Sequence, residues 1–328
     1  MWVRLRPFAC AAALVALSLA PRGAAAFVRE INTPPPPATS QQLYWSSSCE
    51  TVNIYLNGFT QMTPDEVAKS IGAAAAAWGP DQVTCPTGTG DAGSGHPSFQ
   101  IIPQFATGSA PTPWHDGNNT IVFQTDPNST EFPPGALAYT QVWWQPNGNI
   151  IDADIQINAI PGPAGMPYLL ANLDPGSPPE QHDQPRIDLQ TLLTHEFGHF
   201  LGLAHTCEST ADDNGDQPPD GSKDDQGQLI PTCLPYPDSS ETVQAAAVMW
   251  YLVQAESPGT AKRVITTDDA RGVCAIYPPA RVAPACAQNA PDDGCACAAS
   301  GEGSGSALAA ALAGLALVAA RRRRSAKI

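Results

Sequence analysis

The alternation of apolar and polar residues predicts several strands in the first half of the chain. From Val52 to Leu56 apolar side chains occupy every second position, which is the period of a strand with one buried face. Short apolar runs at 99–102 and 120–123, bounded by polar and Gly/Pro-rich segments, are further strand candidates. Residues 136–158 predict a hairpin, because Pro146-Asn147-Gly148 is a turn sequence between two β-rich runs.

The second arm of that hairpin alternates between four apolar and four polar positions. The apolar set is Ile151, Ala153, Ile155 and Ile157, and the polar set is Asp152, Asp154, Gln156 and Asn158. A strand with this pattern is expected to have one face in the core and one in water. The two aspartates are therefore predicted to belong to a solvated face rather than to a site.

A helix is predicted between the first two strands. Thr63 can cap it, Pro64 suits the first helical position, and Glu66 completes a capping box. An alanine-rich series then continues until Gly79-Pro80 ends the helix. Strands and helices alternate at first and strands then cluster, which indicates a mixed α/β layer fold.

Both ends of the chain carry targeting patterns. Residues 1–26 combine a charged start, an apolar run and an alanine-rich cleavage site, which is typical of a secretory signal peptide. Near the other end, Ala307–Ala320 is apolar and is followed at once by four arginines. These fourteen residues would reach only about 21 Å as a helix, short of a hydrocarbon core of roughly 30 Å. Residues 305–328 are therefore predicted to be a stop-transfer or processing signal that leaves the preceding chain outside the cell.

The chain between these ends is predicted to contain one folded domain, residues 46–280. An extended arm, 27–45, precedes it and includes four consecutive prolines. A linker rich in Cys, Gly and Ser, 281–304, follows it. At 328 residues the chain is long enough to bury a sizeable core.

Charge argues against two kinds of partner. The sequence has 16 basic and 31 acidic residues, but eight of the basic residues and only one of the acidic residues lie in the two ends. The remainder carries 8 basic against 30 acidic residues, a net charge of −22. A surface with that charge repels nucleic acid and anionic membranes, so neither is a predicted partner.

Cysteine usage agrees with export. Six cysteines of the body form an even set, which in an oxidising compartment predicts up to three disulfides with fifteen pairings. The body has no CxxC pair that would favour a cysteine metal site. Sequential pairing is predicted, because each successive pair brackets one loop or connection. The predicted pairs are Cys49 with Cys85, Cys207 with Cys233, and Cys274 with Cys286.

The residues that carry chemistry lie on a second predicted helix, capped by Asp188. Its apolar residues recur at helical spacing, which predicts one buried face. They are Leu193, Phe197, Phe200 and Leu201.

His195-Glu196-Phe197-Gly198-His199 stands in this helix. Histidines four apart lie on one helical face, so both imidazoles can reach a single ion. Gly202 tolerates the positive φ of a helix end and lets the chain bring His205 back as a third nitrogen ligand. Three protein ligands leave a fourth position for water, the arrangement of a catalytic zinc. An accidental HExxH is expected only roughly 0.003 times in a chain of this composition, so incidental core histidines are a poor alternative.

The pattern HExxHxxGxxH resembles that of the metzincin zinc peptidases. Ala247–Tyr251 resembles the Met-turn of that family, which implies that Met249 lies beneath the zinc ligands. Residues 265–277 resemble the closing helix of matrixins, and 187–205 are similar to bacterial matrixin-like proteins, as is the 136–158 hairpin.

This resemblance covers roughly residues 43–280. It implies an α/β (α+β) zincin-like fold: a twisted, mostly parallel five-stranded sheet, an active-site helix and a smaller C-terminal subdomain. It also implies a substrate cleft between strand 136–145 and the active-site helix.

Tyr251 departs from the matrixin pattern, which usually has a proline two residues after the methionine. A tyrosine there is more like astacins and serralysins, in which it can approach the metal. Two roles for Tyr251 stay open, stabilising the transition state and lining the pocket wall. Matrixins also often hold a second, structural zinc near the hairpin, but 152–158 contain no histidine and this site is not predicted. The remaining histidines, His96, His115 and His182, are predicted to be ordinary surface residues.

The predicted reaction is hydrolysis of a peptide bond. Zinc lowers the pKa of its bound water from about 16 towards 7 and polarises the scissile carbonyl. Glu196, next to a predicted ligand, is the candidate general base that later passes the proton to the leaving amine. An extended protein or peptide along an edge strand is the predicted substrate. The alternatives are a catalytically silent zincin-fold adhesion or binding module and a zinc hydrolase with a non-peptide substrate; the intact Glu196 argues against the first.

Two further segments predict accessory properties. The aspartates of 212–225 supply hard oxygen ligands suited to Ca²⁺, with a solvated acidic loop as the alternative because the spacing does not match an EF-hand. Gly294–Cys297, the spacer, the apolar run and the arginines resemble the C-terminal sorting tails of myxobacterial surface proteins. That resemblance implies tail-processing and sorting machinery at the membrane as partners, and a location at the cell surface or outside the cell. The sequence predicts no particular oligomeric state.

Overall fold

The computed structural model describes residues 27–31, 41–86, 95–111, 115–126, 136–160, 168–174, 185–207, 246–251 and 261–281, with Asp224, Ile230 and Cys233. All of them belong to a compact unit, Met1–Cys286. The predicted signal peptide, the sorting tail, His182 and most of the acidic segment 212–225 lie outside the described residues.

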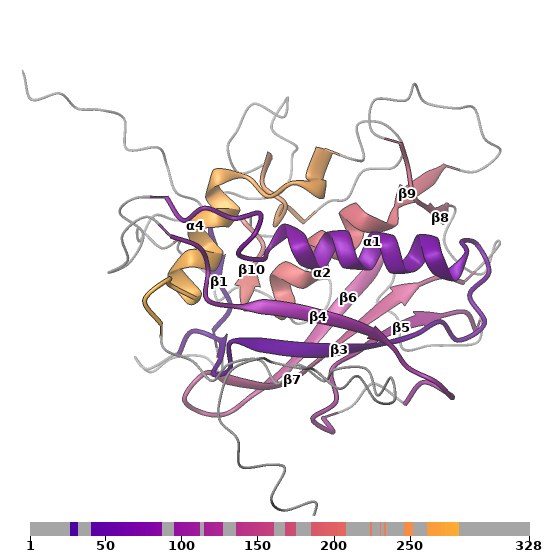
Figure 1. Ribbon diagram of the computed structural model, residues 1–328, viewed down its shortest axis with the longest axis horizontal. Coiled ribbons are helices and arrows are strands. Elements are labelled where there is room, and N and C mark those ends of the chain that lie inside the picture. Colours follow the sequence, from indigo (N-terminus) through magenta and orange to yellow (C-terminus); the bar gives the residue numbers. More distant parts are fainter. Residues whose placement is uncertain are drawn as a thin grey trace, which may run out of the picture. The chain divides into compact units, whose positions relative to one another are not determined.

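Ten strands and four helical segments make up the described part of the chain (Figure 1). The strands are β1 (Val28–Arg29), β2 (Tyr44–Trp45), β3 (Cys49–Tyr55), β4 (Gln100–Phe105), β5 (Thr120–Gln124), β6 (Ala138–Trp144), β7 (Asn149–Asn158), β8 (Leu169–Ala171), β9 (Arg186–Asp188) and β10 (Leu203–Ala204). The helices are α1 (Pro64–Ala77), α2 (Leu189–Phe200) and α4 (Thr267–Ile276), with a short 3₁₀ turn, η1 (Ala261–Arg263).

The main sheet is mostly parallel, as predicted, but it has six strands rather than five. Its order is β2-β7-β5-β3-β4, with parallel pairing throughout, and β6 pairs antiparallel with β7. The additional strand is β2, which comes from the predicted N-terminal arm and pairs with Asn149 and Ile150. The predicted hairpin is confirmed, because β6 and β7 form it around the turn at Gly148.

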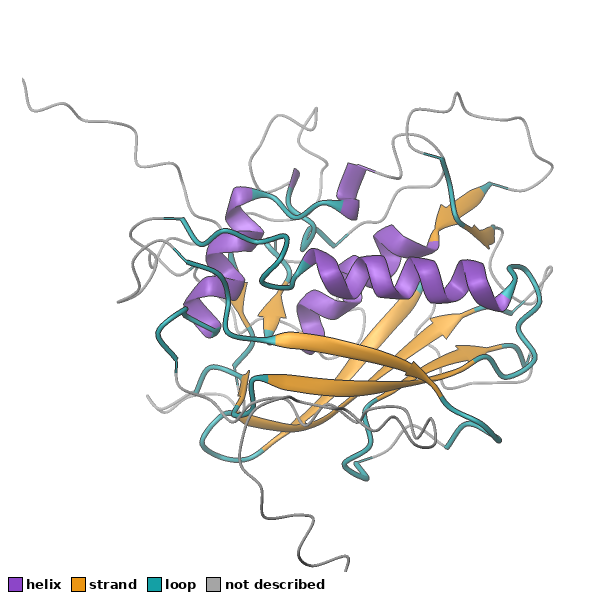
Figure 2. Cartoon of the chain, in the orientation of Figure 1, coloured by secondary structure: helices purple, strands orange, loops and turns teal. Residues whose placement is uncertain are grey.

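Helices α1 and α2 lie on the same face of this sheet (Figure 2). The predicted capping box of α1 is present, since Thr63 accepts from the backbone of Glu66 while the Glu66 carboxylate accepts from that of Thr63. The indole of Trp78, at the end of α1, donates to the carbonyl of Thr194 in α2 at 2.8 Å. This hydrogen bond links the end of α1 to the helix that carries the histidines.

The prediction of a solvated polar face on β7 is wrong. Asp152, Asp154, Gln156 and Asn158 are all buried. The two aspartates accept from backbone groups of β5 and the segment before it: Asp152 from the amides of Asp116 and Gly117, and Asp154 from the amide and hydroxyl of Thr120. Gln156 and Asn158 instead donate to Tyr139 and to the carbonyl of Ala136. Alternation shows that a face is polar, but not whether water or another part of the chain satisfies it.

The apolar pattern of β7 also shifts at one position. The register between β6 and β7 changes at Trp143/Trp144, so that Trp143 pairs with Asp152 but Trp144 pairs with Ile150. Ile150 is buried in the core, and Ile151 is only partly buried. The irregularity therefore turns Ile150, instead of the predicted Ile151, towards the helices.

Sequential disulfide pairing is confirmed for one pair and wrong for the others. Cys207 bonds Cys233, as predicted, but Cys85 bonds Cys274. Cys49 is also disulfide-bonded. Cys85 and Cys274 meet because α4 packs beside the segment that leads into β4, where the Phe99 and Tyr277 ring centroids lie 4.6 Å apart.

The disulfides are consistent with an extracellular protein. Among the described helices, none is long and apolar enough to cross a membrane.

Asp154→Asn is expected to remove a pH-dependent loss of stability. Burial, reinforced by the charges of Asp152 and Asp116 and opposed by hydrogen bonds from Thr120, raises the pKa of the Asp154 carboxyl from 3.8 to about 7. The unfolded chain releases this proton near pH 4 and the folded protein keeps it. The stability that the group contributes is therefore present below pH 4 and is lost as the pH rises through about 7. Asparagine does not ionise, and its carbonyl can accept both bonds from Thr120.

Urea unfolding between pH 4 and pH 8 measures this difference. The Asp154→Asn protein is expected to gain on the order of 1–2 kcal/mol relative to the parent protein over that range, after allowance for solvent screening. Asp81→Asn, at an exposed aspartate, is the matched control and should show no such trend. A difference for Asp154→Asn that stays constant with pH would contradict the prediction.

Candidate metal centre

Helix α2 is fixed at its start by a buried ion pair. Asp188 is its N-cap and accepts from the amide and hydroxyl of Thr191, both at 2.9 Å. Arg263 also donates to the Asp188 carboxylate, with its Nε 2.8 Å from Oδ2, and donates to Asn172 at 3.0 Å. The Asp188 side chain is fully buried, so this pairing with Arg263 compensates its charge.

The end of α2 turns sharply at a glycine. Leu201 is the C-cap, and Gly202 follows with φ of 91°, as predicted from the sequence. A β-carbon at Gly202 would lie 2.7 Å from the carbonyl oxygen of Leu43, so both the conformation and the space require glycine. The turn sends β10 back past the helix and places His205 beside the two helical histidines.

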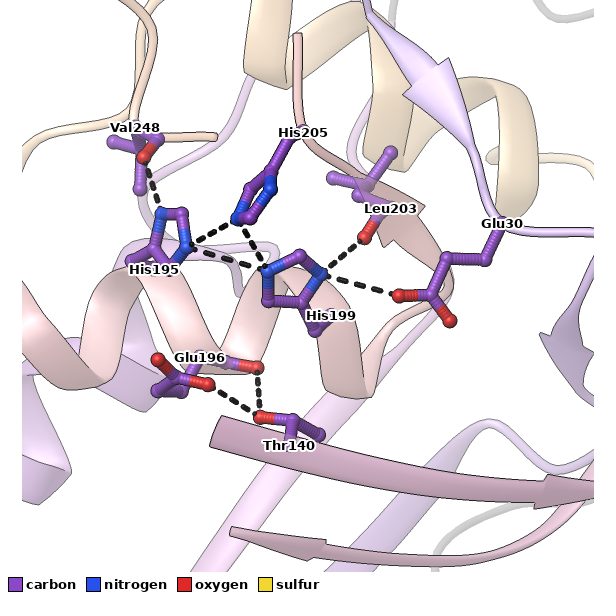
Figure 3. A network of polar contacts seen from close by, with 8 residues as sticks. All are labelled: Glu30, Thr140, His195, Glu196, His199, Leu203, His205 and Val248. Atoms are coloured by element: carbon purple, nitrogen blue, oxygen red, sulfur yellow. Dashed lines mark hydrogen bonds and ion pairs between the residues drawn. The ribbon is translucent and has the colours of Figure 1, made fainter. Parts of the chain in front are cut away.

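The three predicted histidines meet at one point (Figure 3). The Nε2 atom of His205 lies 3.1 Å from those of His195 and His199, which are 3.2 Å apart. Tetrahedral zinc with bonds of about 2.0–2.1 Å to nitrogen would place its ligand nitrogens about 3.3 Å apart. The cluster therefore fits one zinc ion.

Hydrogen bonds at the far side of two rings direct their Nε2 lone pairs towards this point. His195 Nδ1 donates to the carbonyl of Val248 at 2.8 Å, and His199 Nδ1 donates to the carbonyl of Leu203 at 2.9 Å. A proton held on Nδ1 leaves Nε2 free to bind a metal. Burial, reinforced by the neighbouring His199, lowers the pKa of both His195 and His205 well below the usual value and favours their neutral, ligating form.

His199 differs from the other two rings because it also contacts a carboxylate. Its Nδ1 lies 3.1 Å from Oε1 of Glu30. Burial lowers the pKa of His199, but the hydrogen bond and charge of Glu30, together with the charge of Glu196, outweigh burial and raise it.

Glu196 is buried next to the cluster and is held by the edge strand of the sheet. Oγ1 of Thr140, in β6, lies 2.7 Å from Oε2 of Glu196 and 3.2 Å from its backbone carbonyl (Figure 3). Burial raises the pKa of the Glu196 carboxyl, and the charge of His199 and the bond from Thr140 partly oppose that shift. A carboxyl with a raised pKa beside a metal site is suited to taking up and returning a proton.

Met249 lies directly beneath α2. A β-carbon at Gly198 would lie 2.0 Å from Met249 Sδ, so the sulfur occupies the space that this glycine leaves. The turn that contains Met249 is held by Asp269 of α4, which accepts from the amides of Val248 and Met249 at 3.0 and 3.4 Å. The amide of Thr206 also donates to the Met249 carbonyl at 3.0 Å, which connects the turn to the loop of His205.

Tyr251 lies near the ring of His205. Their ring centroids are 6.5 Å apart in an edge-to-face arrangement. Tyr251 and Trp250 pack against the Cys207–Cys233 disulfide. The disulfide therefore ties the loop of the third histidine to the residues that follow Met249.

Two residues of the site, Glu30 and Thr140, were not predicted from the sequence. The supporting role of Asp269 was not predicted either. Residues 27–45 were assigned to an extended arm, and no local pattern connects Glu30 to a histidine 169 residues later. Thr266-Thr267-Asp268-Asp269 does carry a capping-box pattern, and the box is present. His96 and His115 are exposed, as predicted, and neither belongs to the cluster.

A mixed α/β fold with a mostly parallel sheet, together with this histidine triad, is compatible with the zincin-like class of zinc peptidases.

Comparison with known families agrees with that class. The family model of zinc peptidases described as pregnancy-associated plasma protein-A, Peptidase_M43, matches residues 181–253, a stretch that contains all three histidines, Glu196 and Met249. No curated protein matches the chain. The family match and the histidine triad support a zinc metallopeptidase and suggest zinc binding.

Gly198→Ala is expected to destabilise the protein, because the added methyl group meets Met249 Sδ at 2.0 Å and Trp78 at 3.1 Å. Overpacking of this kind costs about 1–3 kcal/mol, and it outweighs the gain of up to about 1 kcal/mol from the better helix propensity of alanine. Gly72→Ala in α1 is the matched control, because a β-carbon there meets nothing within 4 Å. Thermal unfolding should place Gly198→Ala below the parent protein and Gly72→Ala at or above it. Equal stability of the two variants would contradict this account.

Proposed function

We propose that this protein is an exported zinc-dependent endopeptidase in which Glu196 is the general base. The observation that carries the proposal is the meeting of three Nε2 atoms within 3.1–3.2 Å of one another, beside the buried Glu196 carboxyl. The family match over 181–253 supports it.

His195, His199 and His205 would hold the ion. When bound, zinc supplies Lewis acidity, which activates a water molecule and polarises the scissile carbonyl. Glu196 follows His195 directly, so its carboxylate can accept the proton of the attacking water and return it to the leaving amine. Burial of Glu196 and His195 excludes bulk water and strengthens these charge interactions.

A polypeptide is the substrate that the sheet edge favours. In the described part of the chain, β6 pairs only with β7, and Thr140 of β6 contacts Glu196. An extended peptide could therefore add to β6 through main-chain hydrogen bonds, and its scissile bond would then lie near Glu196. Tyr251, near His205, is proposed to line this cleft or to stabilise the transition state.

The finer assignments belong to the same proposal. Residues 265–277 favour a matrixin-like subtype, and the targeting patterns of 1–26 and 305–328 favour export followed by display at the cell surface or release. Calcium binding by the 212–225 segment is a secondary proposal, supported by its density of aspartates.

Glu196→Gln is expected to lower kcat/KM on casein or a peptide library at least about 100-fold while zinc stays bound, because the variant loses the base but keeps the three histidines. Glu50→Gln, at a half-buried glutamate outside the cluster, is the matched control and should retain activity. Removing zinc with a chelator should abolish turnover, and adding zinc should restore it.

Activity that survives both Glu196→Gln and chelation would refute the proposed mechanism. Zinc bound by the unaltered protein without turnover of any peptide would instead favour a binding module.

A further inference from the structure

The segment 27–31 lies against the histidine cluster although it is far from it in the sequence. Glu30 and His199 are separated by 169 residues, yet Oε1 of Glu30 lies 3.1 Å from Nδ1 of His199. The carboxylate faces the edge of the His199 ring that points away from the other two histidines (Figure 3). Both side chains are mostly buried, with 15% of His199 and 24% of Glu30 exposed.

The backbone on which Glu30 stands is held on both sides. Its amide donates to the carbonyl of Gly202, and its carbonyl accepts from the amide of Leu43, both at 2.9 Å. The preceding two residues form β1, which pairs antiparallel with β10. Glu30 therefore directly follows a strand that pairs with β10, the strand that leads from the Gly202 turn to His205.

The start of the segment is anchored as firmly. Phe27 is buried, and its Cβ would lie 3.3 Å from a β-carbon at Gly272 in α4. Arg29 donates from Nη2 to the carbonyl of Leu43 at 3.3 Å and from Nη1 to the side chain of Gln42. These contacts fix β1 without involving any histidine.

The chemistry of the pair is that of a carboxylate supporting a metal ligand. His195 donates its Nδ1 proton to the neutral carbonyl of Val248, whereas His199 shares its Nδ1 proton between the carbonyl of Leu203 and the anionic Glu30. A carboxylate behind an imidazole fixes the ring and its tautomer and makes the opposite nitrogen a stronger donor to a metal.

We infer that Glu30 is a positioning residue of the metal centre, which orients His199 and increases the affinity of the three histidines for zinc. Strand β1 is then part of the metal site rather than an arm outside the domain. This inference rests on the proposed function only in that the histidines bind zinc.

The experiment measures zinc affinity of the full-length protein by competition with a chromophoric chelator. Glu30→Ala is expected to weaken zinc binding about 10- to 100-fold. Glu30→Gln should weaken it less, because the amide oxygen still accepts the proton but the negative charge is lost. With cobalt(II) as a spectroscopic probe, both variants should shift the visible absorption bands, which report the geometry and donor strength of the ligands.

Arg29→Gln is the matched control, since it removes side-chain bonds of the same strand but leaves Glu30 in place. It should keep zinc affinity within about twofold of the unaltered protein and leave the cobalt bands in place. Urea unfolding of each metal-free variant separates a loss of folding from a loss of affinity.

Unchanged zinc affinity and cobalt bands in folded Glu30→Ala would overturn the inference. An equal loss in Arg29→Gln would overturn it as well, since it would assign the effect to strand docking. If the unaltered protein itself binds no zinc, the proposed function fails together with this inference, whereas a normal parent and a normal Glu30→Ala leave the proposed function standing.

Discussion

Three imidazole lone pairs converge inside this protein, with Nε2 atoms 3.1–3.2 Å apart, and the surrounding structure is organised by that constraint. Burial favours the neutral form of His195 and His205, so their lone pairs oppose one another unless a cation lies between them. The carbonyls of Val248 and Leu203 hold the far side of two rings. The arrangement suits a bound metal ion, and its neighbours keep it aligned.

The support for this centre comes from several parts of the chain. The Asp188–Arg263 pair fixes the start of α2, Met249 fills the space beneath Gly198, and Asp269 holds the turn around Met249. The first two contacts join the histidine helix to distant segments of the chain, and the third joins one of those segments to α4. Removing one support would loosen the alignment of the histidines without removing a ligand, which is why such positions are sensitive in metal sites.

Local rules predicted the parts of this structure that local chemistry determines. Capping residues at Thr63 and Asp188 and the positive φ of Gly202 are set by neighbouring backbone groups, and the structure has all three. The meeting of the histidines followed from their spacing on a helix and beyond its end. The alternation of apolar and polar residues also predicted strands, because one face of each strand must enter the core.

What the sequence did not predict depends on contacts between distant segments. The polar face of β7 was expected in water, but the amides of Asp116 and Gly117 need its acceptors. Cys85 meets Cys274 across the fold rather than across a loop, and the arm residue Glu30 reaches His199. Each of these contacts joins segments that are far apart in the sequence, and no local pattern of residues indicates it.

X-ray absorption at the zinc edge on the purified protein identifies the atoms that bind the ion. One zinc ion per chain is expected, with three imidazole nitrogens at about 2.0–2.1 Å and a further light-atom neighbour. His205→Ala should remove one nitrogen from that shell, since His205 is the proposed ligand outside the helix. A protein that binds no zinc, or a zinc shell unchanged by His205→Ala, would contradict a zinc site made by these three histidines.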